Sequence, residues 1–166
     1  MKNYLILLAG IALFLMAGCN KPRQIRQERT FVTENWQKFD TVRYNIDGQE
    51  NEKPRDLNLI VRFNSLYQSR SLPVTILIQA PDGSESVIEK TIWLRNPDDT
   101  PRGELTGAAS WNYTYCFRKA YEFTVPGVYK ILIDNKTGKY DNPGIESISF
   151  EALPTSDREA TDKQGE

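Results

Sequence analysis

The stretch Thr41-Val42-Arg43-Tyr44-Asn45-Ile46-Asp47 decides the fold, because polar and apolar side chains alternate at every position. Successive side chains of a β-strand point to opposite faces, so a period of two indicates a strand with one buried face. A helix would instead place apolar residues at spacings of three and four, and this pattern is not sustained over three turns after residue 18. The stretch therefore predicts a half-buried strand.

The same alternation recurs along most of the remaining chain. Further runs of this type occupy residues 57–63, 74–78, 88–94, 115–123, 128–133 and 148–150. Turn-forming Gly, Pro, Asn and Asp residues separate them. Short strands between such turns, without helical periodicity, predict an all-β protein built as a single antiparallel β-sandwich over residues 31–153. The strand pattern leaves open whether the order is that of a jelly roll or of an immunoglobulin-like domain.

The N-terminal residues have the form of a secretory signal. A lysine at position 2 precedes the apolar run 4–17, which ends in the small residues Ala17-Gly18 before Cys19. The run is too short for a membrane span, which needs about 20 residues. The sequence before Cys19 resembles the lipobox of bacterial lipoproteins, although Met16 stands where leucine is usual. This resemblance implies a signal peptide over 1–18 and a lipidated, palmitate-type Cys19. The alternatives are an ordinary cleaved signal and an uncleaved helix.

The segments on either side of the sandwich are predicted to lack regular structure. Residues 19–30 carry the lipidated cysteine and a polar, basic stretch that is expected to be a flexible tether. Residues 154–166 have no apolar periodicity and are expected to be a disordered tail. No acidic run follows Cys19. Such a run is associated with surface export in lipoproteins of the Bacteroidota, so its absence favours an outer-membrane protein that faces the periplasm.

Composition excludes several functional classes. The chain has 21 Lys and Arg against 22 Asp and Glu, and this balance gives no basis for nucleic-acid binding. It contains no histidine, which removes the commonest general base, the commonest zinc ligand and every Ser-His triad. We therefore predict a protein that is not an enzyme and has no catalytic residues, metal site or cofactor. If Cys19 is lipidated, Cys116 has no disulfide partner and is expected to be a small buried side chain.

Two acidic stretches could offer oxygen ligands to a cation. They are Asp98-Asp99 and residues 82–85. Calcium takes six to eight oxygen ligands, and neither stretch has the regular spacing of a calcium-binding loop. Both are therefore predicted to be solvated turns.

Two aromatic residues are the best candidates for binding a ligand. Trp111 and Tyr113 follow a segment rich in Gly and Ala, residues 102–110, which is predicted to be a loop. Flat rings pack against the CH groups of a sugar, so the pair could form a stacking platform for a glycan. The wider aromatic set includes Trp36, Trp93 and Tyr115. The alternative is that these rings fill the core of the sandwich, which is the usual role of aromatic residues on strands.

Several landmarks, taken in order, resemble the GldH family of gliding-motility lipoproteins of the Bacteroidota. They are Trp36-Gln37-Lys38-Phe39, the run 57–64, Tyr67 with Leu72-Pro73-Val74, Gly103 and Gly107 before Trp111, the run 123–129, and Gly144-Ile145-Glu146-Ser147-Ile148. The sequence departs from the family at Asn112 and Tyr113, where glycines are usual. The resemblance implies a non-enzymatic accessory of the cell envelope, associated with gliding and its linked secretion machinery. It supplies no site residues.

Together these observations predict a lipid-anchored envelope lipoprotein that acts as a structural or interaction component. Its expected contacts are the membrane, through the lipid on Cys19, and envelope proteins. The alternative is a carbohydrate-binding β-sandwich module of the outer membrane that uses Trp111 and Tyr113. A hydrolase is a third hypothesis, for which no residue pair stands out.

Overall fold

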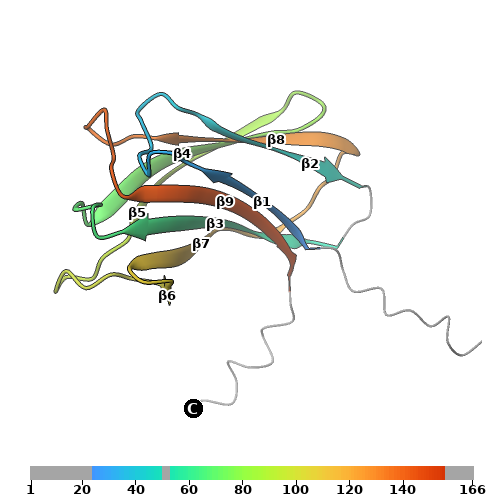
Figure 1. Ribbon diagram of the computed structural model, residues 1–166. Coiled ribbons are helices and arrows are strands. Elements are labelled where there is room, and N and C mark those ends of the chain that lie inside the picture. The colour runs from blue at the N-terminus through green and yellow to red at the C-terminus, as the bar shows by residue number, and fades with distance from the viewer. Residues whose placement is uncertain (1–23, 50–52, 156–166) are drawn as a thin grey trace, which may run out of the picture.

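The computed structural model describes residues 24–49 and 53–155, which form two antiparallel β-sheets packed face to face (Figure 1). The five-stranded sheet has the order β1 (Ile25–Thr30), β9 (Ile145–Pro154), β3 (Arg55–Asn64), β7 (Ser110–Tyr121) and β6 (Glu104–Thr106). The four-stranded sheet has the order β2 (Val42–Gly48), β8 (Gly127–Asn135), β4 (Ser71–Gln79) and β5 (Glu85–Trp93). The predicted all-β sandwich is confirmed. The predicted signal peptide, Cys19 and most of the predicted tail lie outside the described residues.

The strand order is that of a jelly roll, which resolves the alternative that the sequence left open. In each sheet, one of the first two strands of the chain pairs with one of the last two: β1 pairs with β9, and β2 pairs with β8. The chain crosses from one sheet to the other between most successive strands, as in the double Greek key of a jelly roll. The short β6 is an addition at the edge beside β7.

The core lies between the sheets and follows the alternation of the sequence. In β2, the even-numbered residues from Val42 to Gly48 are buried and the residues between them are exposed. The largest fully buried side chains include Trp36, Phe63, Tyr129 and Phe150. Burying one such apolar side chain stabilises the fold by about 1.5–3 kcal/mol, so register errors that turn these residues outward are strongly disfavoured.

Three boundaries differ from the sequence prediction. Residues Ile25–Thr30, which were expected to belong to a flexible tether, form β1 and pair with β9. Residues Glu104–Thr106 form β6 within the predicted loop, and Ser110 begins β7. The last strand extends to Pro154, one residue into the predicted tail. β1 escaped prediction because polar side chains occupy two of its three inward positions, where Gln27 and Arg29 hydrogen-bond to the backbone carbonyl oxygens of Asn45 and Thr41.

The connections of the sandwich gather at two opposite ends (Figure 1). β1 and β9 run antiparallel, so the N-terminal end of β1 lies beside the C-terminal end of β9, and this is the proximal end. The strand registers place four longer connections at the other end, the distal end. We call them the distal loops, which are residues 31–41, 65–70, 94–103 and 136–144.

Candidate functional site at the distal loops

Exposed apolar side chains are concentrated at the distal end. Of the large apolar side chains that are exposed in the described part of the chain, Val87 and Val128 lie toward the proximal end. The others lie in the distal loops or at strand positions next to them: Val32, Phe39, Leu66, Trp93, Leu105 and Tyr140. Single exposed apolar residues are normal on a protein surface, whereas several of them at one end make that end the candidate interaction surface.

The loop 31–41 presents the two most exposed of these side chains. Val32 is 100% exposed and Phe39 is 82% exposed. Phe39 has a φ of 71°, in the left-handed region that residues other than glycine rarely adopt. The Nζ atom of Lys38 lies 5.6 Å from the centroid of the Phe39 ring, within the range of a cation–π contact. Backbone strain of this kind persists only where the surrounding structure imposes it.

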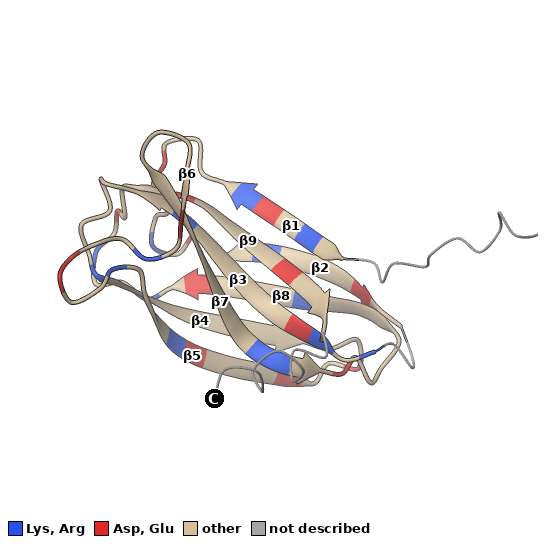
Figure 2. Ribbon diagram, turned by 90° about the horizontal axis from the view of Figure 1, so that it is seen from below, with Lys and Arg blue, Asp and Glu red and all other residues tan. Residues whose placement is uncertain are grey.

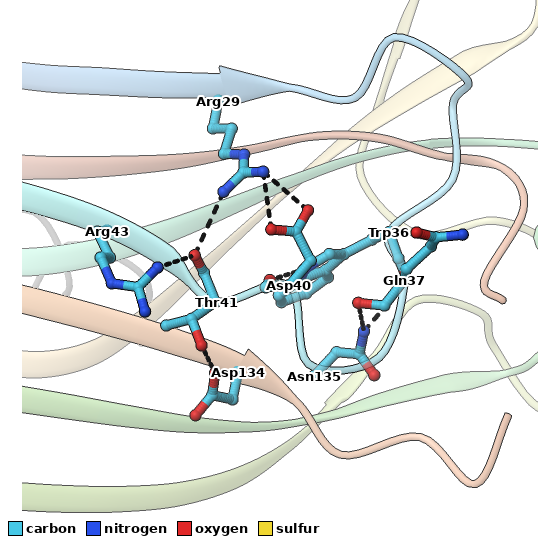
Figure 3. A network of polar contacts seen from close by, with 8 residues as sticks. All are labelled: Arg29, Trp36, Gln37, Asp40, Thr41, Arg43, Asp134 and Asn135. Carbon is cyan, nitrogen blue, oxygen red and sulfur yellow. Dashed lines mark hydrogen bonds and ion pairs between the residues drawn. The ribbon is translucent and has the colours of Figure 1, made fainter. Parts of the chain in front are cut away.

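Trp36 anchors the loop 31–41 to the core of the sandwich. Its side chain is fully buried and stacks on Phe31, with ring centroids 5.7 Å apart. Its Nε1 donates a hydrogen bond of 2.7 Å to the carbonyl oxygen of Asp40 (Figure 3). The bond satisfies the one polar atom of a buried indole. It also fixes the backbone immediately after Phe39.

Polar side chains from two strands, β1 and β8, hold the same loop from its sides (Figure 3). The guanidinium of Arg29 on β1 donates to both carboxylate oxygens of Asp40 at 2.8 Å. The hydroxyl of Thr41 donates to Asp134 on β8 at 2.5 Å. Asn135, also on β8, donates to the carbonyl oxygens of Trp36 and Gln37 at 3.1 Å each. Both bonds to Asp40 come from one guanidinium nitrogen of Arg29, and such charge-assisted bonds are stronger than bonds between neutral groups. The strained backbone at Phe39 is therefore imposed by contacts from outside the loop.

The loop 136–144 lies against the loop 31–41 and is joined to it by backbone and side-chain bonds. The backbone N–H of Lys38 donates to the carbonyl oxygen of Tyr140 at 2.7 Å. The buried amide of Asn142 donates to the carbonyl oxygen of Trp36 at 3.0 Å. These bonds place the exposed side chains of Phe39 and Tyr140 on adjacent loops. The two loops therefore form one surface.

A shallow cavity lies beside this surface. It has a volume of about 280 Å³ and is lined by residues of the loops 65–70 and 136–144, among them Leu66, Lys139 and Pro143. Tyr67 forms its buried wall and donates its hydroxyl to the carbonyl oxygen of Ser71 at 2.8 Å. Burial raises the pKa of Tyr67 to about 12, so the phenol stays neutral at physiological pH.

The structure places the predicted stacking pair on the inner face of the five-stranded sheet. Trp111 pairs with Phe63 across β7 and β3, and their ring centroids are 5.9 Å apart. Tyr113 packs against the core, and the guanidinium of Arg102 lies 4.9 Å from the centroid of its ring. A role in glycan stacking stays a prediction, while this packing favours the alternative that the rings contribute to the core.

Other residues singled out in the sequence have local structural roles. The side chain of Asp82 accepts hydrogen bonds from the N–H and hydroxyl of Ser84, and Asp98 accepts the same pair of bonds from Thr100. These bonds lower the pKa of both carboxyl groups and confirm the predicted turns. Cys116 was expected to be buried, but it lies half-buried on the outer face opposite Asn58. Partial burial raises the pKa of its thiol.

The sequence contained one signal for the exposed position of Phe39. The buried residues of β2 have even numbers, and Trp36 continues this phase whereas Phe39 does not. Trp36 is fully buried, in agreement with this alternation, whereas Phe39 and Val32 are exposed.

The family model described as "GldH lipoprotein" matches residues 23–151, most of the chain. The chain belongs to the GldH lipoprotein family. Membership makes it a lipoprotein of the gliding-motility type, anchored to the membrane of the cell envelope. In the described ranges 24–49 and 53–155, no helix is both long and apolar enough to span a membrane.

Comparisons beyond the GldH family are less informative. No curated protein matches the chain. Among solved structures, the VP2 subviral particle of infectious bursal disease virus has 14% identity and a TM-score of 0.35. The structure of the Gx strain of that virus has 12% identity and a TM-score of 0.27. Each match covers 81% of this chain but only 34% of the viral chain, so the GldH-family protein spans about a third of its length. These low scores carry no argument about the protein.

Proposed function

We propose that this GldH-family lipoprotein is a non-enzymatic interaction component of the cell envelope, whose distal loops bind a protein partner. It is anchored in the outer membrane by palmitate-type acyl chains on Cys19 and faces the periplasm. The observation that carries the proposal is the group of exposed apolar side chains at the distal end, presented on loops that long-range hydrogen bonds hold in place.

The position of the anchor supports a protein partner at this end. A chain extends by at most about 3.6 Å per residue, so the five steps from Cys19 to Gln24 span at most about 18 Å. β3 has ten residues, and at about 3.3 Å per residue it separates the two ends by about 30 Å. The anchor therefore holds the proximal end near the membrane, and the distal loops point to the aqueous space.

The chemistry of the distal loops also suits a protein interface. Such interfaces are enriched in aromatic residues at the centre and have a polar rim. Phe39 and Tyr140 supply the aromatic rings, while Lys38 and Asp141 lie beside them. The adjacent cavity of about 280 Å³ is below the range of about 300–1,000 Å³ typical of small-molecule sites. Its size suits a single side chain of a partner.

The anchor is tested by the variant Cys19→Ala. Two acyl chains give stable attachment because each buried CH₂ contributes about 0.8 kcal/mol. We expect wild-type protein in the outer-membrane fraction and the variant in the soluble periplasmic fraction. A variant that stayed membrane-bound at high salt would show that lipid on Cys19 is not the anchor.

The distal surface is tested by affinity capture from gently crosslinked cells. The test variant combines Phe39→Ser and Tyr140→Ser, and the matched control combines Val87→Ser and Val128→Ser. All four side chains are exposed, so neither double variant should unfold. We expect a fixed set of envelope proteins to be enriched with wild type and control and lost with the distal variant. Equal enrichment with both variants would place the interaction elsewhere.

A further inference from the structure

β5 and β7 belong to different sheets and border the same side of the sandwich (Figure 2). Two side-chain contacts link them. A guanidinium nitrogen of Arg118 on β7 donates to the hydroxyl of Ser86 on β5 at 3.1 Å. Nearer the distal end, Arg102 donates to the carbonyl oxygen of Trp93 on β5 at 3.2 Å, and its guanidinium lies over the ring of Tyr113 on β7. We call the line between the two strands the seam.

A third basic side chain lies between these two contacts. Lys90 is on β5, at one of the even-numbered positions that face the other sheet. Its neighbours on that face, Ile88 and Ile92, are buried, whereas Lys90 is exposed. Its side chain therefore leaves the sandwich along the seam, with its charged end in water. The stretch of β5 from Ser86 to Trp93 spans about 23 Å at about 3.3 Å per residue, so the three basic groups form a row of that length.

The three basic groups of the seam have no carboxylate partner in the part of the chain that the structure describes. Lys90, Arg102 and Arg118 form no ion pair there. β7 contains no acidic residue. The acidic residues of β5, Glu85 and Glu89, occupy odd-numbered positions, which face away from the other sheet. A row of charges of one sign attracts groups of the opposite sign, so a ligand of the seam is expected to be acidic.

The backbone of β7 is open along the seam. β7 forms a regular ladder with β3 from Ser110 to Cys116, but β6 covers its other edge only from Ser110 to Asn112. From Tyr113 onward, that edge has no strand partner among the described residues. An open edge exposes backbone N–H and C=O groups, which an extended peptide can bind as an added strand. The open edge therefore favours a peptide over an acidic polysaccharide.

β5 also has an open edge, but that edge suits an acidic strand less well. Glu85 and Glu89 lie on β5 itself, and like charges on neighbouring strands weaken their pairing. β7 lacks acidic residues and already pairs with β6, so a further strand would continue the line of β6 along the same edge. These two differences favour β7 as the strand that accepts the peptide.

We propose that the seam binds an acidic, extended segment of a partner protein, which adds as a strand to β7 beyond β6. Side chains on one face of a strand recur at every second residue. Carboxylates at alternate positions of the segment therefore face β5 and pair with Lys90, Arg102 and Arg118. The seam runs along the side of the sandwich, away from the surface formed by the loops 31–41 and 136–144, so this site does not rest on the proposed function.

The test measures binding of a labelled peptide to the mature, lipidated protein in detergent micelles by fluorescence anisotropy. The probe is a capped decapeptide of alternating Glu and Val. The control peptides carry Lys in place of Glu, or a fully N-methylated backbone that cannot form a strand ladder. Polygalacturonate serves as an acidic polysaccharide. We expect saturable binding of the Glu-Val peptide alone.

Hydrogen exchange followed by NMR locates the bound peptide. Amide hydrogens within residues 113–116 should exchange more slowly when the Glu-Val peptide is bound. Those within residues 42–48 of β2, which is an edge strand of the other sheet, should not change. Saturable binding without protection of residues 113–116 would contradict strand addition to β7.

Two double variants make the assignment specific. Lys90→Gln with Arg118→Gln removes two of the three charges and should weaken binding at least about tenfold. Arg43→Gln with Lys130→Gln removes two exposed charges from the outward face of the four-stranded sheet and should leave affinity unchanged. Failure of the Glu-Val peptide to bind, or equal affinity in the two double variants, would overturn the proposal. Binding of the N-methylated peptide or of polygalacturonate with the affinity of the Glu-Val peptide would also overturn it, because neither can add as a strand.

Discussion

The two ends of the sandwich are built in different ways. At the proximal end, the turn between β4 and β5 is short and is closed by its own atoms, since Asp82 accepts two hydrogen bonds from Ser84. At the distal end, the loop 31–41 is fixed by Arg29, Asp134 and Asn135 from other strands. The proximal turn only reverses the chain. The distal loop instead holds Phe39 exposed in a strained conformation, and this difference supports the proposal that the distal loops bind a partner.

The largest expected effect comes from the side chain beneath the distal loop. Trp36→Ala should lower the free energy of unfolding by about 3–5 kcal/mol, because the change leaves a cavity and removes the bond to the Asp40 carbonyl. Denaturant unfolding followed by circular dichroism measures the change. A loss below about 1 kcal/mol would show that Trp36 does not hold the loop in place.

Substitution of two glycines with similar φ angles distinguishes the cost of backbone strain from the cost of close packing. Gly144 has a φ of 89°, and a Cβ atom there would lie 2.1 Å from the backbone nitrogen of Tyr67. Gly83 has a φ of 85° and no atom within 4 Å of that position. Gly144→Ala should cost about 3 kcal/mol, from strain and overpacking together. Gly83→Ala should cost only about 1 kcal/mol. Equal losses of thermal stability in the two variants would contradict the claim that the distal end is held by close packing between loops and the proximal turn is not.

Tyr67 should make the distal end sensitive to alkali. Its pKa in the folded state is about 12, above the ordinary value of 10.0. Its contribution to stability is therefore complete below pH 10 and is lost as the pH rises to 12, by about 2 kcal/mol. Unfolding free energies of wild type and Tyr67→Phe, compared at pH 9 and pH 11.5, should show a smaller alkaline loss in the variant. Parallel losses in both proteins would assign the effect to other groups.

Phe39→Gly should have the smallest effect on stability and a large effect on binding. Glycine relieves the cost of a positive φ, so the free energy of unfolding should stay unchanged or rise by up to about 1 kcal/mol. Partner capture from crosslinked cells should nevertheless fall, because the exposed ring is gone. A variant that lost both stability and capture would show that Phe39 is structural.

The sequence predicted what depends on local pattern. Alternation identified β2 because its inward residues are apolar, and the Asp82 turn was predicted because its bonds span two residues. β1 was missed because Gln27 and Arg29 face inward, so only its pairing with β9 reveals it as a strand.

The candidate surface could not be predicted from the sequence, because it also depends on contacts between residues that are distant in the sequence. The exposure of Phe39 depends on Asn135, which is distant in the sequence and joins the loop only after the sheets have formed. Trp111 and Tyr113 were predicted to flank a loop, yet β7 includes both and turns them inward. The alternation of polar and apolar residues predicts which side chains of a strand face the core. It does not predict which loop a side chain from a distant part of the sequence will contact.

The most direct measurement is site-specific photo-crosslinking in living cells with a photoreactive phenylalanine analogue. It is placed at position 39 in the distal loop or at position 87 on β5, where the native side chains are both exposed. The account predicts a discrete crosslink to one envelope protein from position 39 and none from position 87. The same crosslinks from both positions, or a discrete product from position 87 alone, would contradict the claim that the distal loops are the binding surface.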